Sequence, residues 1–224
     1  MNAILNGIVR RLFGSGRKLP ETQQPFAMDF AGGQAMSQLL PPKALRAAAG
    51  RRYNAVVGNG ATFIAPVTAV PTTTATFLLF NGEAAGGKSY FIDTAYAFLA
   101  SGTNGVGGAL LGAVTLSAQQ AAGVLPAAYA STVVSSLSGK SGGTKGVLAN
   151  AWTIVGGTPS WGVLAKSEAA AGATIGANVL LANLDGGIVV PPQYGLALTV
   201  LSGTGTTALY GVGVSWDEIE ADLE

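Results

Sequence analysis

The sequence predicts an all-β domain, either a sandwich or a barrel, that follows an extended N-terminal arm. From about residue 53 onward, apolar and polar residues alternate with a period of two, which is typical of half-buried strands. Segments rich in glycine separate these runs at short intervals, as in folds built from many short strands. We therefore divide the chain into a basic N-terminal arm (residues 1–52), a β-sandwich domain (residues 53–218) and an acidic C-terminal tail (residues 219–224).

Four alternating runs are the clearest strands, and they lie at residues 72–79, 90–98, 196–200 and 209–216. Residues 151–155 and 179–181 are further candidates. The segments GTNGVGG, SGKSGGTKG, VGGTPSWG and LDGG are predicted to be connections. Two hairpins are expected, one around NGEAAGGK and one around SGTGTT. One short helix is expected among the strands, because Ser117 and Gln120 are spaced as a capping box.

The N-terminal arm is expected to contain two short helices joined by an extended linker. In residues 1–13 apolar residues recur at helical spacing, and they are Ile4, Leu5, Ile8, Val9, Leu12 and Phe13. A helix of this length is marginally stable alone, so its apolar stripe requires a surface on which to pack. Residues 14–41 are rich in Gly, Pro and Gln. Pro42 is placed to begin a second helix, KALRAAA, which Gly50 ends.

The composition excludes several classes of catalytic and metal site. The 224 residues include no cysteine and no histidine. Disulfide bonds, thiolate or imidazole metal ligands, and nucleophiles activated by histidine are therefore impossible. We expect no enzymatic activity, no cofactor and no metal ion.

Charged residues are scarce and unevenly distributed. They make up 10% of the chain, against about 25% in an ordinary soluble domain. Low charge favours a surface covered by neighbouring subunits, although a neutral surface of serine, threonine and asparagine would also account for it. Residues 1–52 have a net charge of about +6, whereas the last eight residues hold five acidic side chains. Such segregation favours contacts with a partner or between copies of the chain, with a solvated head and tail as the alternative.

Residues Gly82 to Ser89, GEAAGGKS, match the P-loop pattern G-x-x-x-x-G-K-[ST]. In a P-loop the glycine backbone cradles phosphates, the lysine reaches the β- and γ-phosphates, and the serine hydroxyl binds magnesium. That geometry requires a helix directly after the motif. The next residues, YFIDTAYAF, instead alternate like a strand. We interpret the octamer as a loop between strands and keep nucleotide binding as an alternative.

Other side chains offer weaker candidates for a site. The acids available for a glycoside-hydrolase pair are Glu83, Asp93, Glu168 and Asp185, and the sequence places no two of them together. The acids from Asp217 onward are expected to form a solvated tail. Trp152, Trp161 and Trp216 could form a platform for sugars, but packing in a core or an interface is the commoner role of tryptophan.

Two stretches resemble a known class of proteins, and they read TFLLFNGEAAGGKSYFIDTAYAFLASGT and VVPPQYGLALTVLSGTGTTALYGVGVSWDE. They are similar in texture to small jelly-roll-like structural proteins of tailed phages, namely capsid decoration or cement proteins and related head or tail components. The resemblance covers about residues 53–218 and includes no catalytic signature. It implies a jelly-roll β-sandwich and a virion subunit, commonly a homotrimer, whose terminal arm clasps the capsid or neighbouring subunits.

Together these features predict a structural subunit of a phage particle that attaches through its arm and oligomerises through its β domain. The expected apolar anchor is Ile4, Ile8, Leu12 and Phe13, and its electrostatic partner is Arg10, Arg11, Arg17 and Lys18. The expected partners are the major capsid protein or other virion proteins, and further copies of the chain. DNA contact by the basic arm is a less favoured alternative, as is a tail, adaptor or receptor-binding module.

The N-terminal segment also bears on where the protein resides. Its arginines follow the apolar residues instead of preceding them, which is not the order of a secretory signal. Two arginines are few for a membrane-surface anchor, so docking on protein is favoured over docking on a membrane. We expect assembly in the host cytoplasm and a final location in the virion.

Overall fold

Period-two alternation produces strands throughout the part of the chain that the computed structural model describes. The described residues are 42–57, 63–118, 133–135, 144, 146–167, 179–203 and 206–220. Pro41–Glu224 forms one compact unit. The helix predicted over residues 1–13 and most of the helix predicted after Ser117 lie outside the described residues.

Within the described residues of this unit, the elements with assigned bounds are one helix and ten strands. In chain order they are α2 (Pro42–Ala48), β1 (Arg52–Val57), β2 (Thr74–Asn81), β3 (Ser89–Ser101), β4 (Ala109–Leu116), β5 (Val133–Ser135), β6 (Gly146–Thr153), β7 (Gly162–Ser167), β8 (Val179–Val190), β9 (Gly195–Ser202) and β10 (Leu209–Ile219). The four clearest strands of the sequence, now β2, β3, β9 and β10, are confirmed. The candidates at 151–155 and 179–181 lie at the end of β6 and the start of β8.

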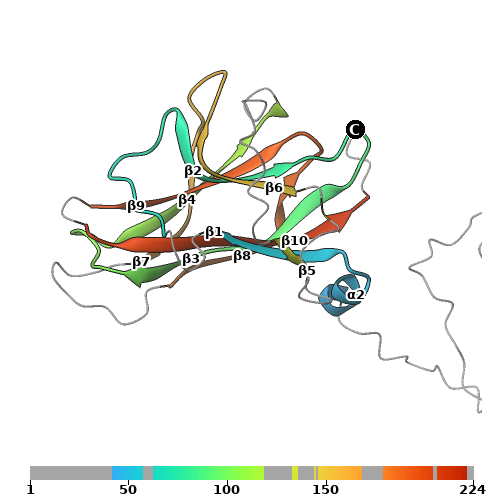
Figure 1. Cartoon of the computed structure of the whole chain (residues 1–224), viewed down its shortest axis with the longest axis horizontal. Coiled ribbons are helices and arrows are strands. Elements are labelled where there is room, and N and C mark those ends of the chain that lie inside the picture. The colour runs from blue at the N-terminus through green and yellow to red at the C-terminus, as the bar shows by residue number, and fades with distance from the viewer. Residues whose placement is uncertain are drawn as a thin grey trace, which may run out of the picture. The chain divides into compact units, whose positions relative to one another are not determined.

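The strands form two five-stranded sheets that face each other, which confirms the predicted β-sandwich. The first sheet has the order β5-β1-β10-β3-β8 and the second has the order β6-β2-β9-β4-β7. In Figure 1, β1 and β10 lie in the lower layer and β2 and β9 in the upper one. Strands β1 to β4 alternate between the sheets, as do β7 to β10. Without the edge strands β5 and β6, this is the eight-stranded order of a jelly roll.

Both predicted hairpins are wrong. Strands β2 and β3, which flank NGEAAGGK, belong to opposite sheets, and so do β9 and β10, which flank SGTGTT. Each loop therefore crosses from one layer of the sandwich to the other. Glycine-rich turn residues permit a tight reversal but do not specify it, so the same local signal fits a crossing between sheets.

The sequence predicts that the segment LDGG is a connection, and this is wrong. LDGG is part of the long strand β8. The pairing of β3 with β8 shifts register between Ile92 and Thr94, opposite this segment. Asp185 and Gly186 both have positive φ, at 47° and 82°. A bulge of this kind accommodates the extra residues and keeps the strand in the sheet.

The core lies between the two sheets and is closed by aromatic stacking. Trp216 is fully buried on β10 and stacks against Tyr53 and Tyr90, with ring centroids 5.8 Å away in each case. Leucine and phenylalanine side chains of β2 and β9, including Phe77, Leu79 and Leu198, complete this cluster. The prediction that tryptophan packs in a core is confirmed for Trp216.

Helix α2 has the ends that the sequence predicts. Pro42 is its first residue, and Gly50 follows its last turn with φ of 68°, which favours glycine. The amide of Gly50 donates to the carbonyl of Ala47, and the amide of Arg51 donates to the carbonyl of Arg46. This is a Schellman cap, and it directs the chain from α2 into β1.

Candidate interaction face

The face of the first sheet that points away from the core is organised in bands. Strand registers place Arg52 beside Asp217, and Asn54 beside Ser215 and Thr94 in the next band. A third band crosses the sheet from Val56 through Gly213 and Tyr96 to Leu181, and it continues through Phe98 and Val179. We name the first the ionic band (Lys43, Arg46, Arg52, Asp93, Asp185, Asp217). The third is the apolar band (Phe63, Val56, Tyr96, Phe98, Val179, Leu181), in which the Phe63 ring lies edge-on to the Phe98 ring with centroids 6.2 Å apart.

In the apolar band, two aromatic rings lie over glycines of β10. A Cβ atom at Gly211 would lie 2.3 Å from the Phe98 ring, and one at Gly213 would lie 2.5 Å from the Tyr96 ring. Each ring therefore rests directly on the β10 backbone. Beside them, Val179 and Leu181 on β8 are each 54% exposed. Exposed aliphatic side chains next to partly exposed rings are typical of a protein-contact surface.

In the ionic band, three cations share two buried carboxylates. One carboxylate oxygen of Asp93, on β3, forms an ion pair with Arg52. The other oxygen forms an ion pair with the Lys43 Nζ at 2.5 Å. One carboxylate oxygen of Asp217, on β10, forms an ion pair with Arg46 at 2.7 Å, and the other forms an ion pair with Arg52 at 3.5 Å. Arg52 thus bridges the two carboxylates, while α2 supplies one further cation to each.

The exposure of these groups differs between carboxylates and helix cations. The Asp93 and Asp217 side chains are 6% and 3% exposed, whereas those of Lys43 and Arg46 are 52% and 41% exposed. Burial would raise the pKa of Asp93, but hydrogen bonds from Lys43 and Arg52 outweigh it and hold that pKa below its usual value. Hydrogen bonds to Asp185 and Asp93 raise the pKa of Lys43.

Part of the charge that is segregated along the sequence is therefore paired within one chain. Lys43 and Arg52 pair with Asp93 in the middle of the chain, and Arg46 and Arg52 pair with Asp217 near the C-terminus. The prediction that the acids from Asp217 onward form a solvated tail is wrong for the first two. Asp217 and Glu218 are 2% and 1% exposed, because β10 continues to Ile219 and its alternation carries Glu218 to the core side.

The octamer Gly82–Ser89 forms the crossing between β2 and β3. The segment after it is strand β3, as predicted, and not the helix that a P-loop requires. Lys88 points to Glu218, with the Lys88 Nζ and Glu218 Oε2 atoms 3.6 Å apart. Asn81 secures the crossing by donating to the carbonyls of Lys88 and Val190, both at 2.9 Å.

Glu218 lies at the end of the core next to the crossing between β2 and β3. Its Oε1 accepts a hydrogen bond from the Thr144 hydroxyl, and Glu83 is a nearby buried acid. Burial raises the pKa of Glu218, and the Thr144 hydrogen bond and the Lys88 charge offset this only in part.

Replacing Glu218 with glutamine is expected to flatten the pH dependence of stability. The folded state holds the Glu218 proton more tightly than the unfolded state, because its folded pKa is raised. Native stability therefore falls as the pH rises from about 4.5 through the raised pKa. Urea unfolding midpoints between about pH 4 and 8 measure this slope. Glu220→Gln, at an exposed position, is the control, and an unchanged slope in Glu218→Gln would contradict the assignment.

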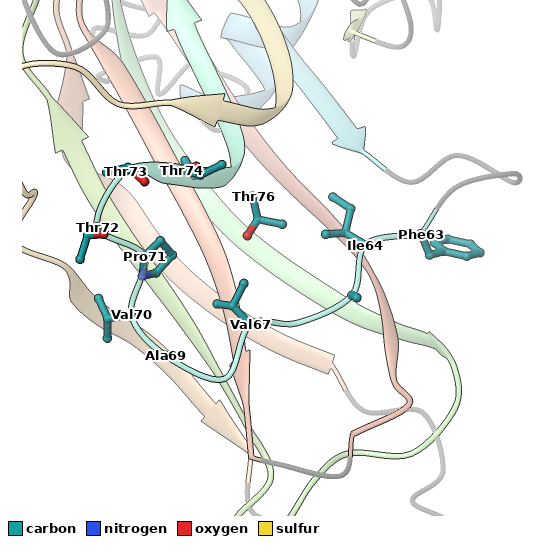
Figure 2. Close-up of a pocket in the computed structure, with 12 residues that line it drawn as sticks. Phe63, Ile64, Val67, Ala69, Val70, Pro71, Thr72, Thr73, Thr74 and Thr76 are labelled. Carbon is teal, nitrogen blue, oxygen red and sulfur yellow. The ribbon is translucent and has the colours of Figure 1, made fainter.

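A second surface feature is a hollow of about 620 Å³, lined by the segment that leads from residue 63 into the start of β2 at residues 74–76. Figure 2 shows Val67 and Thr76 directed into this arch and Phe63 directed away from it. Ile64 pairs with Tyr210 of β10 and Val67 with Leu201 of β9, so the arch spans both sheets. Among the described residues that line it, the side chains are threonines and apolar groups, and none is charged.

Several residues singled out in the sequence can now be placed. The predicted anchor and its electrostatic partner lie outside the described residues, and these are Ile4, Ile8, Leu12, Phe13, Arg10, Arg11, Arg17 and Lys18. Asp93 and Asp185, which the sequence could not bring together, both contact Lys43. Trp161 is partly buried and donates its indole N–H to the carbonyl of Pro71 at 2.8 Å.

The ionic band itself was missed by sequence reasoning. The sequence places Arg52 in the arm and predicts that Asp217 is solvated, although the alternation of β10 runs on through Trp216 to Glu218. That continuation was the available signal. Among the described residues, no group of three or more acidic side chains is placed to hold a metal ion, and no helix is long and apolar enough to cross a membrane.

Comparison with known proteins gives little similarity. No family model matches the sequence, and no curated protein matches it. A chain in the structure titled "Structure of infectious bursal disease virus Gx strain" is similar at 16% identity with a TM-score of 0.34. The match covers 78% of this chain and 33% of that one, so the protein spans about a third of its neighbour's length. A TM-score of this size is too low to bear on function.

Proposed function

We propose that the protein is a non-enzymatic structural subunit of a virus particle, a phage capsid decoration or cement protein, that packs against copies of itself through the apolar band. The exposure of Val179 and Leu181 beside the flat Tyr96 and Phe98 rings is the observation that carries this proposal. The low charged fraction and the resemblance to tailed-phage structural proteins point in the same direction. The jelly-roll order is compatible with it, although this fold also serves other functions.

The mechanism would be mechanical. The apolar band would be covered by a neighbouring copy, and the arm would dock on the major capsid protein or another virion protein through Ile4, Ile8, Leu12 and Phe13. A closed ring of copies, such as a trimer, would bury the band of every subunit. The arms of the several copies would then attach at once, and the overall avidity of such an assembly exceeds the affinity of a single arm.

Val179→Asp is expected to break this self-association. A charge buried in an apolar contact loses its hydration, so the dissociation constant should rise by about tenfold or more. Native mass spectrometry and light scattering of the full-length chain over a range of concentrations measure the oligomeric state.

Val163→Asp is the matched control, because Val163 is a valine of similar exposure, 63%, on β7 of the second sheet. It should leave the oligomer intact. A wild-type chain that stays monomeric at about 100 μM, or equal effects of the two variants, would count against the apolar band as the interface.

A further inference from the structure

The ionic band has a feature that the packing of copies does not require. Both oxygens of Asp93 and both oxygens of Asp217 are occupied, and in each case Arg52 takes one oxygen and a cation of α2 takes the other. Arg52 belongs to β1 and stays with the sheet. If α2 departs, each buried carboxylate keeps one cationic partner.

Among the described side chains of α2, Lys43 and Arg46 hold the helix on the sheet through these ion pairs. The helix has seven residues, and its described side chains other than Lys43 and Arg46 are alanines. Two turns of helix are marginal alone, so its persistence depends on its contacts. The two helix cations are about half exposed and so are open to screening by salt, whereas the carboxylates beneath them are not.

We propose that α2 is an electrostatic latch that opens and closes as a unit on the first sheet while the sandwich stays folded. In the closed state Lys43 contacts Asp93 and Asp185, and Arg46 contacts Asp217. In the open state Arg52 alone bridges Asp93 and Asp217. Figure 1 shows α2 beside the end of the first sheet, near β5 and β10.

Opening changes the reach of the chain that precedes β1. As a helix, residues 42–48 span about 10 Å, at about 1.5 Å per residue. Extended, the same residues span about 23 Å, at about 3.3 Å per residue. The latch therefore sets the span of residues 42–48 before β1, and salt or a competing charged partner lengthens that span. This inference does not depend on the apolar band or on self-association.

Hydrogen exchange of the full-length chain, read by mass spectrometry, tests the latch. In about 1 M NaCl, exchange of the α2 amides is expected to rise by about tenfold, while exchange of β10 stays unchanged. Arg46→Gln is expected to have the same effect at low salt. Arg51→Gln is the matched control, because it removes an exposed positive charge next to α2 that is not part of the ionic band.

Two results would overturn the proposal. If α2 and β10 exchange rise together in salt and in Arg46→Gln, the helix and the sheet open as one unit and there is no separate latch. If neither salt nor Arg46→Gln changes α2 exchange, the ion pairs do not hold the helix. Arg46 is 41% exposed, so its replacement leaves the core intact, and the salt experiment on the wild-type chain needs no variant.

Discussion

Replacing Arg52 with methionine is expected to lower the free energy of unfolding by about 3 kcal/mol. Arg52 bridges Asp93 and Asp217, whose side chains are 6% and 3% exposed, and is itself only 17% exposed. Without it, two buried carboxylates on adjacent central strands share only the exposed cations of α2. Breaking a buried pair by removing one partner is far more costly than losing a surface pair, because the remaining carboxylates are shielded from water and keep only the partly exposed cations Lys43 and Arg46. Urea unfolding of the variant and the wild-type chain measures the difference.

Two comparisons separate this effect from a loss of packing. Arg46→Met removes a partner of the same Asp217 from an exposed position and should cost about 1 kcal/mol or less. The triple variant Arg52→Met, Asp93→Asn, Asp217→Asn removes the buried charges together and should recover much of the loss. If Arg52→Met and Arg46→Met cost the same, or the triple variant recovers nothing, buried charge is not the cause.

The sandwich was predictable because its causes are local, whereas the loop crossings were not. Alternation at residues 90–98 and 209–216 fixes which side chains face the core, and β3 and β10 follow from it. Whether a strand then pairs with its neighbour in sequence or crosses to the other sheet depends on packing across the whole domain. The glycine-rich loops after β2 and β9 are compatible with both, so the hairpin prediction had no physical basis for choosing.

The ionic band was unpredictable for a different reason. A buried acid is tolerated only where its partners are assembled, and the partners of Asp217 come from α2 and β1 at the other end of the chain. A cluster of acids near a C-terminus is therefore predicted to be solvated unless the strand pairing is known. The apolar band was partly predictable from the sequence, since the alternation along one strand places Tyr96 and Phe98 on the same face. Their position over Gly213 and Gly211 is set by the register of β3 with β10.

Trp216→Ala is expected to cost about 3–5 kcal/mol, and Trp216→Phe distinctly less. Trp216 is fully buried, and its ring stacks on Tyr53 of β1 and on Tyr90 of β3. Alanine leaves a cavity at the junction of three strands, whereas phenylalanine keeps one ring between the two tyrosines. Urea unfolding and the near-ultraviolet circular dichroism of the stacked rings measure the two effects.

Trp161→Phe is the control for Trp216, because Trp161 is only partly buried and lies in the loop before β7. Its replacement loses one hydrogen bond, to Pro71, and should cost about 1 kcal/mol. The test depends on which variant loses more free energy of unfolding, and less on the size of either loss. β1 and β3 flank β10 in the first sheet, so the Trp216 stack joins the strand that follows α2 to the two strands bearing Asp217 and Asp93. If Trp216→Ala costs no more than Trp161→Phe, the stack does not hold these strands together, and the frame on which the ionic band rests must owe its rigidity to other contacts.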